Sequence, residues 1–157
     1  MAEEQQPRIL LEVRKLYVGD LSVEVPNAPE VFQQSLNPEI SLGINHENKK
    51  LKEENYYSVH LRLTVTAKDS TSSSVIYLVE ATQTGIFEIV GLDESQLQHA
   101  LNVYCTTVLY PYAREVISSA ITHAGFPSLY LQPINFDALY QQQLQQEQNT
   151  TAQGGEA

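Results

Sequence analysis

The sequence predicts an α+β fold in which four strands precede the helices. Two observations carry this prediction. Apolar side chains alternate with period two between residues 9 and 83, and they recur with helical spacing from residue 93 onward. Because strands and helices do not alternate along the chain, a βαβ arrangement is excluded. With 157 residues, the chain is long enough for one domain with a sizeable core.

The first two strands are expected at residues 9–25 and 40–44. Apolar residues occupy alternate positions in both segments, and polar residues lie between them. Gly19 interrupts the first segment, and an isolated glycine within a strand indicates a kink or a bulge. The first strand is therefore expected to be long and to bend at Gly19.

The third and fourth strands are expected at residues 57–68 and 75–83. The third strand places six apolar residues on one face and six polar residues on the other. The Ser-rich run 69–74 predicts a turn, and this short connection favours antiparallel pairing. The fourth strand is apolar on both faces, which is typical of a strand that is covered on both sides or binds something. Its apolar residues are Val75, Tyr77 and Val79 on one face and Ile76 and Leu78 on the other.

Three helices are expected after these strands. Asp93 and Gln96 have the spacing of a capping box and predict the start of the first helix. Pro111 suits the first turn of a second helix, and Gly125 suits its C-terminal end. Asn135 can cap a third helix, which carries aromatic and aliphatic residues as far as residue 144.

A single folded domain is predicted at residues 8–145. Residues 1–7 are expected to be a flexible N-terminus, and residues 146–157 a disordered tail, because the tail is Gln-rich, small and polar. The N-terminus lacks the basic start and apolar run of a signal peptide. No apolar stretch reaches the roughly 18–20 residues that cross a bilayer. A cytoplasmic protein without membrane insertion is expected.

The charge is strongly acidic and unevenly distributed. The formal net charge is −10, which disfavours binding to DNA or RNA because phosphates attract basic surfaces. Residues 1–68 hold 8 basic and 10 acidic side chains, whereas residues 69–157 hold Arg114 alone against nine acids. This acidity either keeps the protein soluble or forms a negative face that attracts a basic partner.

Motifs for catalysis and for metal binding are missing. The sequence has no glycine-rich phosphate loop, no Gly-x-Ser-x-Gly and no Cys-x-x-Cys. None of the four histidines has a second His or Cys at metal-ligand spacing. Cys105, the single cysteine, lies on an apolar helix stripe and is interpreted as a buried hydrophobe. Glu115 beside Arg114 is interpreted as a surface or interface ion pair rather than as a proton donor. No enzymatic activity, cofactor or metal is predicted.

Five segments of the chain have the pattern of a known family. They are Pro26–Phe32, Leu63–Ala67, Gly85–Gly91, Tyr110–Glu115 and Pro133–Tyr140. Through these segments, which occur in the family's order, the sequence resembles the SecB family of bacterial protein-export chaperones over about residues 8–145. The turn at 69–74 is longer and richer in Ser than the family pattern, and Thr84 stands where the family often has a glycine.

The resemblance implies a fold, an assembly and an activity. The fold is a four-stranded antiparallel sheet with C-terminal helices, and the assembly is a homotetramer formed as a dimer of dimers. The activity is that of a chaperone without ATPase activity. Such a protein binds unfolded precursor chains, keeps them competent for translocation and delivers them to the translocation ATPase SecA.

The resemblance also assigns two sets of site residues. The SecA-facing surface maps onto Asp20, Glu24, Leu78 and Glu80. Any zinc at that contact would belong to SecA, because this chain has no ligand set for it. The candidates for the client-binding groove are the aromatic residues Phe32, Tyr110, Phe136 and Tyr140.

Two other functions compete with this reading. The first is a structural oligomeric scaffold whose apolar strand serves only self-assembly. The second is a small-molecule enzyme that uses Tyr and Glu side chains in an aromatic cleft. A chaperone should gain the mass of an unfolded client in a native mass measurement, whereas a scaffold should not, and an enzyme should turn over a metabolite.

Overall fold

Four long strands form one antiparallel sheet in the computed structural model, which describes residues 8–153. The spatial order is β1-β4-β3-β2, so β1 and β2 are the edge strands. This confirms the predicted fold class. The strands are β1 (Leu10–Glu24), β2 (Pro38–Lys50), β3 (Tyr56–Asp69) and β4 (Val75–Val90).

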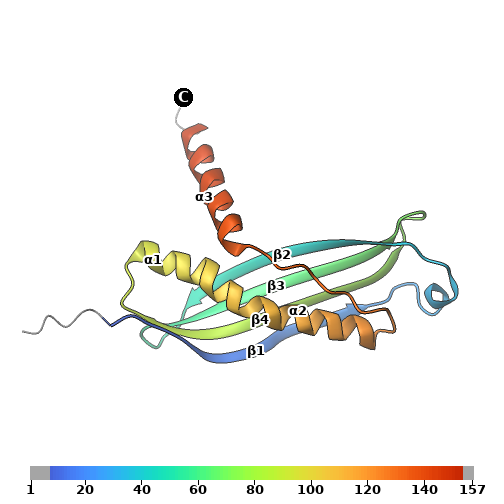
Figure 1. Ribbon diagram of the computed structural model, residues 1–157, viewed down its shortest axis with the longest axis horizontal. Coiled ribbons are helices and arrows are strands. Elements are labelled where there is room, and N and C mark those ends of the chain that lie inside the picture. Colours follow the sequence, from blue (N-terminus) through green and yellow to red (C-terminus); the bar gives the residue numbers. More distant parts are fainter. Residues whose placement is uncertain (1–7, 154–157) are drawn as a thin grey trace, which may run out of the picture.

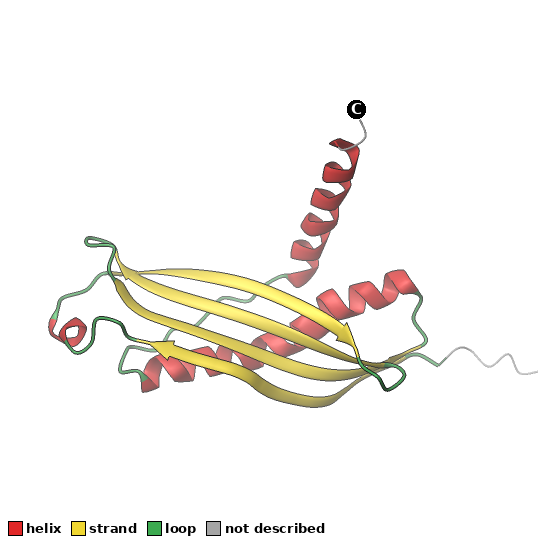
Figure 2. Ribbon diagram, turned by 180° about the vertical axis from the view of Figure 1, so that it is seen from behind, coloured by secondary structure: helices red, strands yellow, loops and turns green. Residues whose placement is uncertain are grey.

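The helices lie on one side of this sheet. α1 (Glu94–His99), the π-helical turn η2 (Ala100–Tyr104) and α2 (Cys105–His123) form one continuous helical segment. Figure 1 shows α2 lying along the sheet and α3 (Phe136–Gln153) standing away from it. We name the side covered by α2 the inner face and the opposite side the outer face. Figure 2 shows the outer face with no described helix in front of it.

The core lies between α2 and the inner face. Odd-numbered residues of β3 pair with odd-numbered residues of β4, so the apolar rows of both strands share this face. Full burial of a Leu or Val side chain contributes about 1.5–3 kcal/mol relative to its exposure. The predicted six-residue apolar row of β3 therefore supplies much of the core. Its buried members are Val59, Leu61, Leu63, Val65 and Ala67. On the same face, β4 buries Tyr77, Val79, Ala81, Phe87 and Ile89.

β1 contains two bulges, and one of them lies at the predicted kink. Its register with β4 shifts between Val18 and Asp20, at Gly19, and between Val13 and Lys15, at Arg14. Each bulge adds one residue, which would turn all following side chains to the other face if the strand did not compensate. The apolar positions in β1 change parity at each bulge, so they remain on the inner face.

The helical segment differs from the prediction at Pro111. We expected a new helix to begin there, but Pro111 lies inside α2. A proline in a helix removes the hydrogen bond to the carbonyl four residues earlier. That carbonyl belongs to Thr107, which is exposed, so water can satisfy it. The helix therefore continues while one face of it packs on the sheet.

The π-helical turn also shifts the predicted apolar stripe by one residue. The helical spacing of the apolar residues predicts that Tyr104 and Val108 face the core. Val108 is partly buried against the core, but Tyr104 is 41% exposed, and Cys105 and Leu109 are fully buried. A π turn closes on the fifth residue rather than the fourth, so it inserts one residue into the repeat.

The ends of the helices follow the predicted capping residues. Asp93 Oδ1 accepts a hydrogen bond of 2.8 Å from the Gln96 amide, which completes a capping box. Gly125 has a φ of +95°, a conformation that favours glycine, and it ends α2. Asn135 Oδ1 accepts a 3.0 Å hydrogen bond from the Ala138 amide at the start of α3.

Three boundaries differ from the sequence prediction. β2 extends beyond residues 40–44 to Pro38–Lys50, because the whole of this segment pairs with β3. β4 continues past Gln83 to Val90, because residues 84–88 pair with both β1 and β3 and residues 89–90 pair with β1. α3 continues to Gln153, so residues 146–153 are helical where we expected disorder. Gln, Glu and Ala are good helix formers, although they offer little apolar surface. Residues 1–7 and 154–157, which we expected to be flexible, lie outside the described residues.

Candidate functional site

The acidic candidates come together on the outer face of the sheet. Asp20 pairs with Thr82 and Glu24 pairs with Leu78, while Glu80 lies between these two positions on β4. Because side chains in a strand alternate between faces, all four predicted residues point to the same side. We name Asp20, Glu24, Leu78 and Glu80 the outer acidic surface. The resemblance predicted these residues as a set, and the strand register brings them together.

Glu80 is the most constrained carboxylate of the outer acidic surface. Its Oε2 accepts a 3.0 Å hydrogen bond from the Thr64 hydroxyl. Its Oε1 lies 3.9 Å from Nε of Arg62, and that nitrogen also donates to Thr82 Oγ1 at 3.2 Å. Arg62 was missed at the sequence level, although the alternation of β3 already placed it on the polar face.

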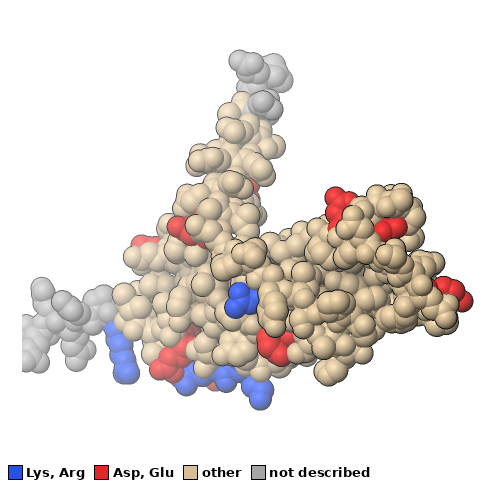
Figure 3. All heavy atoms as spheres, turned by 45° about the vertical axis from the view of Figure 1, so that its right-hand side comes forward, with Lys and Arg blue, Asp and Glu red and all other residues tan. Residues whose placement is uncertain are grey.

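Charge is unevenly distributed over the molecule. In Figure 3, Lys and Arg side chains gather mainly along the lower edge, whereas the right-hand end shows Asp and Glu but no Lys or Arg. On the outer face, Asp20 and Glu24 take part in none of the ion pairs found among residues 8–153. The outer acidic surface can therefore offer unpaired carboxylates to a basic group.

An apolar groove lies at the other candidate site, on the inner side of the sheet. The start of β2, the start of β4 and the segment after α2 line an open groove of about 300 Å³. The walls are almost entirely apolar, which suits aliphatic and aromatic side chains. Its lining residues are Leu36, Pro38, Ile40, Ile76, Tyr77, Phe126, Pro127, Ser128 and Leu129.

Phe32 forms an exposed aromatic rim beside this groove. Its ring stacks on the Phe126 ring with centroids 5.1 Å apart, and the centroids of the Phe126 and Tyr77 rings are 4.9 Å apart. Phe32 itself remains 52% exposed. A β-carbon at Gly125 would come within 3.2 Å of the Phe32 ring. Glycine at position 125 therefore both ends the helix and leaves room for this ring.

Asp69 fixes the loop that forms one side of the groove. Its Oδ1 accepts a 3.1 Å hydrogen bond from the Asn37 amide, next to Leu36 and Pro38. Its Oδ2 accepts a 2.8 Å hydrogen bond from the Ser72 hydroxyl. The Asn37 amide, followed by the Ser72 hydroxyl, lowers the pKa of Asp69 below its usual value.

The four aromatic client candidates do not form one cluster. Phe32 lies at the groove, as described above. Tyr110 and Phe136 are buried and pack edge to face, with centroids 5.8 Å apart. The Tyr110 hydroxyl donates to the carbonyl oxygen of Gln132. The Tyr140 ring on α3 packs edge to face with the His99 ring, and their centroids are 5.9 Å apart.

The burial of Tyr110 and Phe136 makes them contacts of the subunit core in this arrangement. They join α2 to the start of α3 rather than face an open groove. Sequence reasoning missed Phe126 as a groove-lining residue. The only signal for Phe126 was an aromatic residue between a helix-ending glycine and a proline, which does not reveal what it contacts.

The cysteine and the Arg114–Glu115 pair singled out in the sequence make structural contacts. Cys105 is fully buried, and burial raises the pKa of its thiol to about 12. The guanidinium carbon of Arg114 lies 5.6 Å from the centroid of the Tyr110 ring. Glu115 accepts a 2.6 Å hydrogen bond from the Ser119 hydroxyl. These contacts replace the expected pairing of Arg114 with Glu115. Within residues 8–153, no group of three His, Cys, Asp or Glu side chains could hold a metal ion.

The inner side of edge strand β1 carries uncovered apolar surface. Val13, Val18, Leu21 and Val23 face the same side as α2 and are 40–46% exposed. A row of exposed aliphatic residues next to an unpaired strand edge is typical of an interaction surface. Among residues 8–153, no helix is both long and apolar enough to cross a membrane.

The fold and the two surfaces define a class of protein before any comparison. A single α+β subunit carries an apolar groove on one side of its sheet and an acidic surface on the other, which fits a protein that binds other polypeptides. A solved SecB-like chaperone of Mycobacterium tuberculosis, in complex with a peptide from an antitoxin, shares this fold with a TM-score of 0.61. That match covers 79% of this chain and 90% of the other at 16% identity.

Sequence comparison identifies the family. The family described as preprotein translocase subunit SecB matches residues 2–147. The protein-export protein SecB of Alcanivorax borkumensis is 42% identical over 156 residues, which span 99% of this chain and 98% of that protein. The chain therefore belongs to the SecB family, whose members are chaperones of protein export.

Proposed function

We propose that this chain holds unfolded precursor proteins in its apolar groove and passes them to SecA through its outer acidic surface. The observation that carries the proposal is the separation of the two surfaces. The apolar groove lies on the inner side of the sheet, and the acidic surface lies on its outer side. A client and an acceptor can then bind the same subunit at once.

Client binding rests on the groove around Phe32, Tyr77 and Phe126. An aromatic-lined groove accepts many apolar side chains because apolar contacts are not directional. An extended client spans about 3.3–3.6 Å per residue, so a long segment can reach grooves on several subunits. Weak sites then combine through their high effective concentration. Binding of this kind needs no sequence code and no nucleotide. Capture takes place in the cytoplasm, before the precursor reaches the membrane.

The proposed assembly is a homotetramer, formed as a dimer of dimers. The uncovered aliphatic row of β1 supports self-association, since it offers each subunit an apolar edge to bury. Native mass spectrometry should give four times 17.6 kDa for the protein alone and a larger mass with unfolded polypeptide. A tetramer that never gains client mass would favour the structural scaffold.

Client capture is tested by the refolding of a slow-folding precursor without ATP. The protein should lower the refolding rate in proportion to the occupied grooves, and Phe32→Ala should reduce this effect. Tyr112→Ala is a matched control, because Tyr112 is also about half exposed but lies on α2 away from the groove. Unchanged refolding in the presence of the unmodified protein would refute client capture.

The SecA contact is tested by reversal of Glu80. Glu80→Lys replaces attraction with repulsion and should weaken SecA binding strongly, while client capture and oligomer mass remain nearly unchanged. Glu24→Gln should act in the same direction more mildly. Added salt should lower the SecA affinity of the unmodified protein until it approaches that of the two variants. The reason is that the Debye length falls from about 10 Å at 0.1 M to 3 Å at 1 M. If both variants bind SecA as well as the unmodified protein in calorimetry at low salt, the acidity is only solubilising.

A further inference from the structure

One cation lies within the outer acidic surface and has no part in the proposed function. Arg62 on β3 pairs with Thr82 of β4 and with Asn45 of β2. Glu80 on one side and Glu47 on the other are each displaced from it by one diagonal step, within reach of a long side chain. Arg62 therefore lies between two carboxylates that belong to different strands.

The arrangement occupies Glu80 from two directions. Thr64 binds one carboxylate oxygen at 3.0 Å, and Arg62 Nε lies 3.9 Å from the other. A basic side chain of a partner must therefore share Glu80 with Arg62 or displace it. The side chain of Arg62 is 51% exposed, and that of Glu80 is 35% exposed, so a partner can reach both.

An open depression lies beside Arg62 on the side of β2. It has a volume of about 160 Å³, and Glu47 and His60 form part of its wall together with Arg62. Neither the proposed client groove nor the acidic contact uses this space. It offers the guanidinium a second position, near a carboxylate other than Glu80.

We propose that the Arg62 side chain covers Glu80 in the free protein and moves towards Glu47 when a basic segment of a partner binds Glu80. We name this side chain the movable cover. The proposal rests on the proposed function of the outer acidic surface. Its physical basis is an exchange of one ion pair for another, so the displaced guanidinium is not left without a carboxylate. Arg62 then determines specificity, because weakly basic segments do not compete with a covalently tethered cation.

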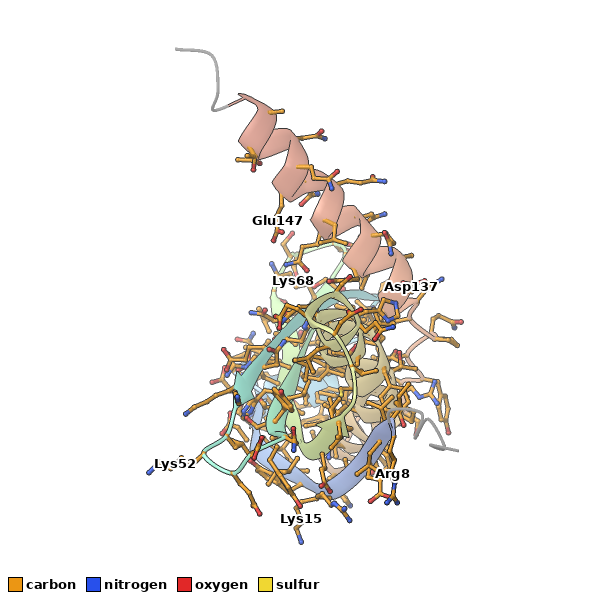
Figure 4. All side chains as sticks on the ribbon, turned by 90° about the vertical axis from the view of Figure 1, so that its left-hand side faces the viewer. Arg8, Lys15, Lys52, Lys68, Asp137 and Glu147 are labelled. Carbon is orange, nitrogen blue, oxygen red and sulfur yellow. The ribbon has the colours of Figure 1, made fainter. Side chains whose placement is uncertain are left out.

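The first test removes the cover and measures affinity for a synthetic hexalysine peptide. Calorimetry at about 0.15 M salt should show two- to five-fold tighter binding to Arg62→Gln, the range that exposed ion pairs support. Lys15→Gln is the matched control, because it removes one cation from the same face. Lys15 lies opposite Ile86, about 20 Å along the sheet from Glu80, and points away from the sheet in Figure 4.

The distance of Lys15 exceeds the Debye length of about 8 Å at this salt concentration. Lys15→Gln should therefore change affinity by less than about 1.5-fold if the effect of Arg62 is local. Equal tightening in both variants would show that net charge alone is responsible, and it would overturn the proposal.

The second test examines the alternative position of Arg62. Glu47→Gln should weaken hexalysine binding while Arg62 is present, because the displaced guanidinium loses its second carboxylate. The same substitution should have no effect in the Arg62→Gln protein. An equal effect of Glu47→Gln in both backgrounds would show that Glu47 binds the peptide directly, which contradicts the movable cover.

A spectroscopic measurement separates failure of this proposal from failure of the proposed function. The Nε–H resonance of Arg62 in the peptide-free protein should shift in Glu80→Gln, because the ion pair is lost. If Glu80→Gln abolishes peptide binding without shifting this resonance, the outer acidic surface still binds basic peptides, but Arg62 does not cover Glu80 and the movable cover is refuted. If hexalysine does not bind the unmodified protein, the acidic surface itself fails and the cover with it.

Discussion

On β3, Leu61 and Leu63 point to the inner face and are fully buried, whereas Arg62 between them points to the outer face and is half exposed. The same comparison holds on β4, where Val79 is buried and Glu80 keeps contact with water. A strand thus presents two independent chemical surfaces one residue apart. The inner face supplies stability and the groove, whereas the outer face carries exposed charge, which we propose serves a partner.

The largest expected effect comes from moving a charge to the inner face. Val79→Arg should lower the free energy of unfolding by several kcal/mol, because it buries an unpaired cation. Leu78→Arg is the matched substitution one residue away, on the outer face, and should cost far less. Urea melts and sedimentation of both variants measure this difference. An equally stable, normally assembled Val79→Arg protein would show that the two faces are not distinct.

A smaller effect separates the core aromatics from the groove aromatics. Phe136→Ala should cost about 3–5 kcal/mol of stability, the usual range for a buried aromatic residue. Phe32→Ala should cost much less and should weaken client capture instead, because Phe32 is half exposed at the groove. Urea melts beside client-binding curves decide between these roles. Client binding that depends on Phe136 at full stability would place it in the groove after all.

The smallest effect concerns the acidic side chain at the end of the apolar row of β3. Because the folded-state pKa of Asp69 is lowered, its ionised form stabilises the fold above the unfolded pKa of about 3.9. This contribution should disappear as the pH falls through the lower folded-state pKa. Asp69→Asn should therefore be less stable than the unmodified protein near pH 7, and the two should converge below pH 4 in urea melts. A constant difference across this range would contradict the assigned hydrogen bonds.

The faces of the strands and the ends of the helices could be predicted from the sequence. Period two in β3 and β4 placed Leu78 and Glu80 on one side and Val79 on the other. The capping pattern at Asp93 and the glycine at position 125 located two helix ends. These features depend on residues within a few positions of one another, so local physical chemistry determines them.

The groove could not be predicted in this way. Its walls come from residues 36–40, 76–77 and 126–129, which are distant in the sequence and meet only when the sheet and α2 pack. Tyr110 and Phe136 looked equally available for a client, and only the packing of α2 against the start of α3 buries them. The predicted burial of Tyr104 was wrong because the π turn at Ala100–Tyr104 adds one residue to the helical repeat.

The sequence by itself determined the α+β class, the alternation that separates the two faces, and the acidic residues that share one of them. The tertiary structure decided which aromatic residues stay exposed, which carboxylate Arg62 pairs with, and where an open depression remains beside Arg62. The physical reason is the range of the interactions involved. Backbone geometry fixes side-chain direction from one residue to the next, whereas burial and ion pairing depend on which strands and helices become neighbours.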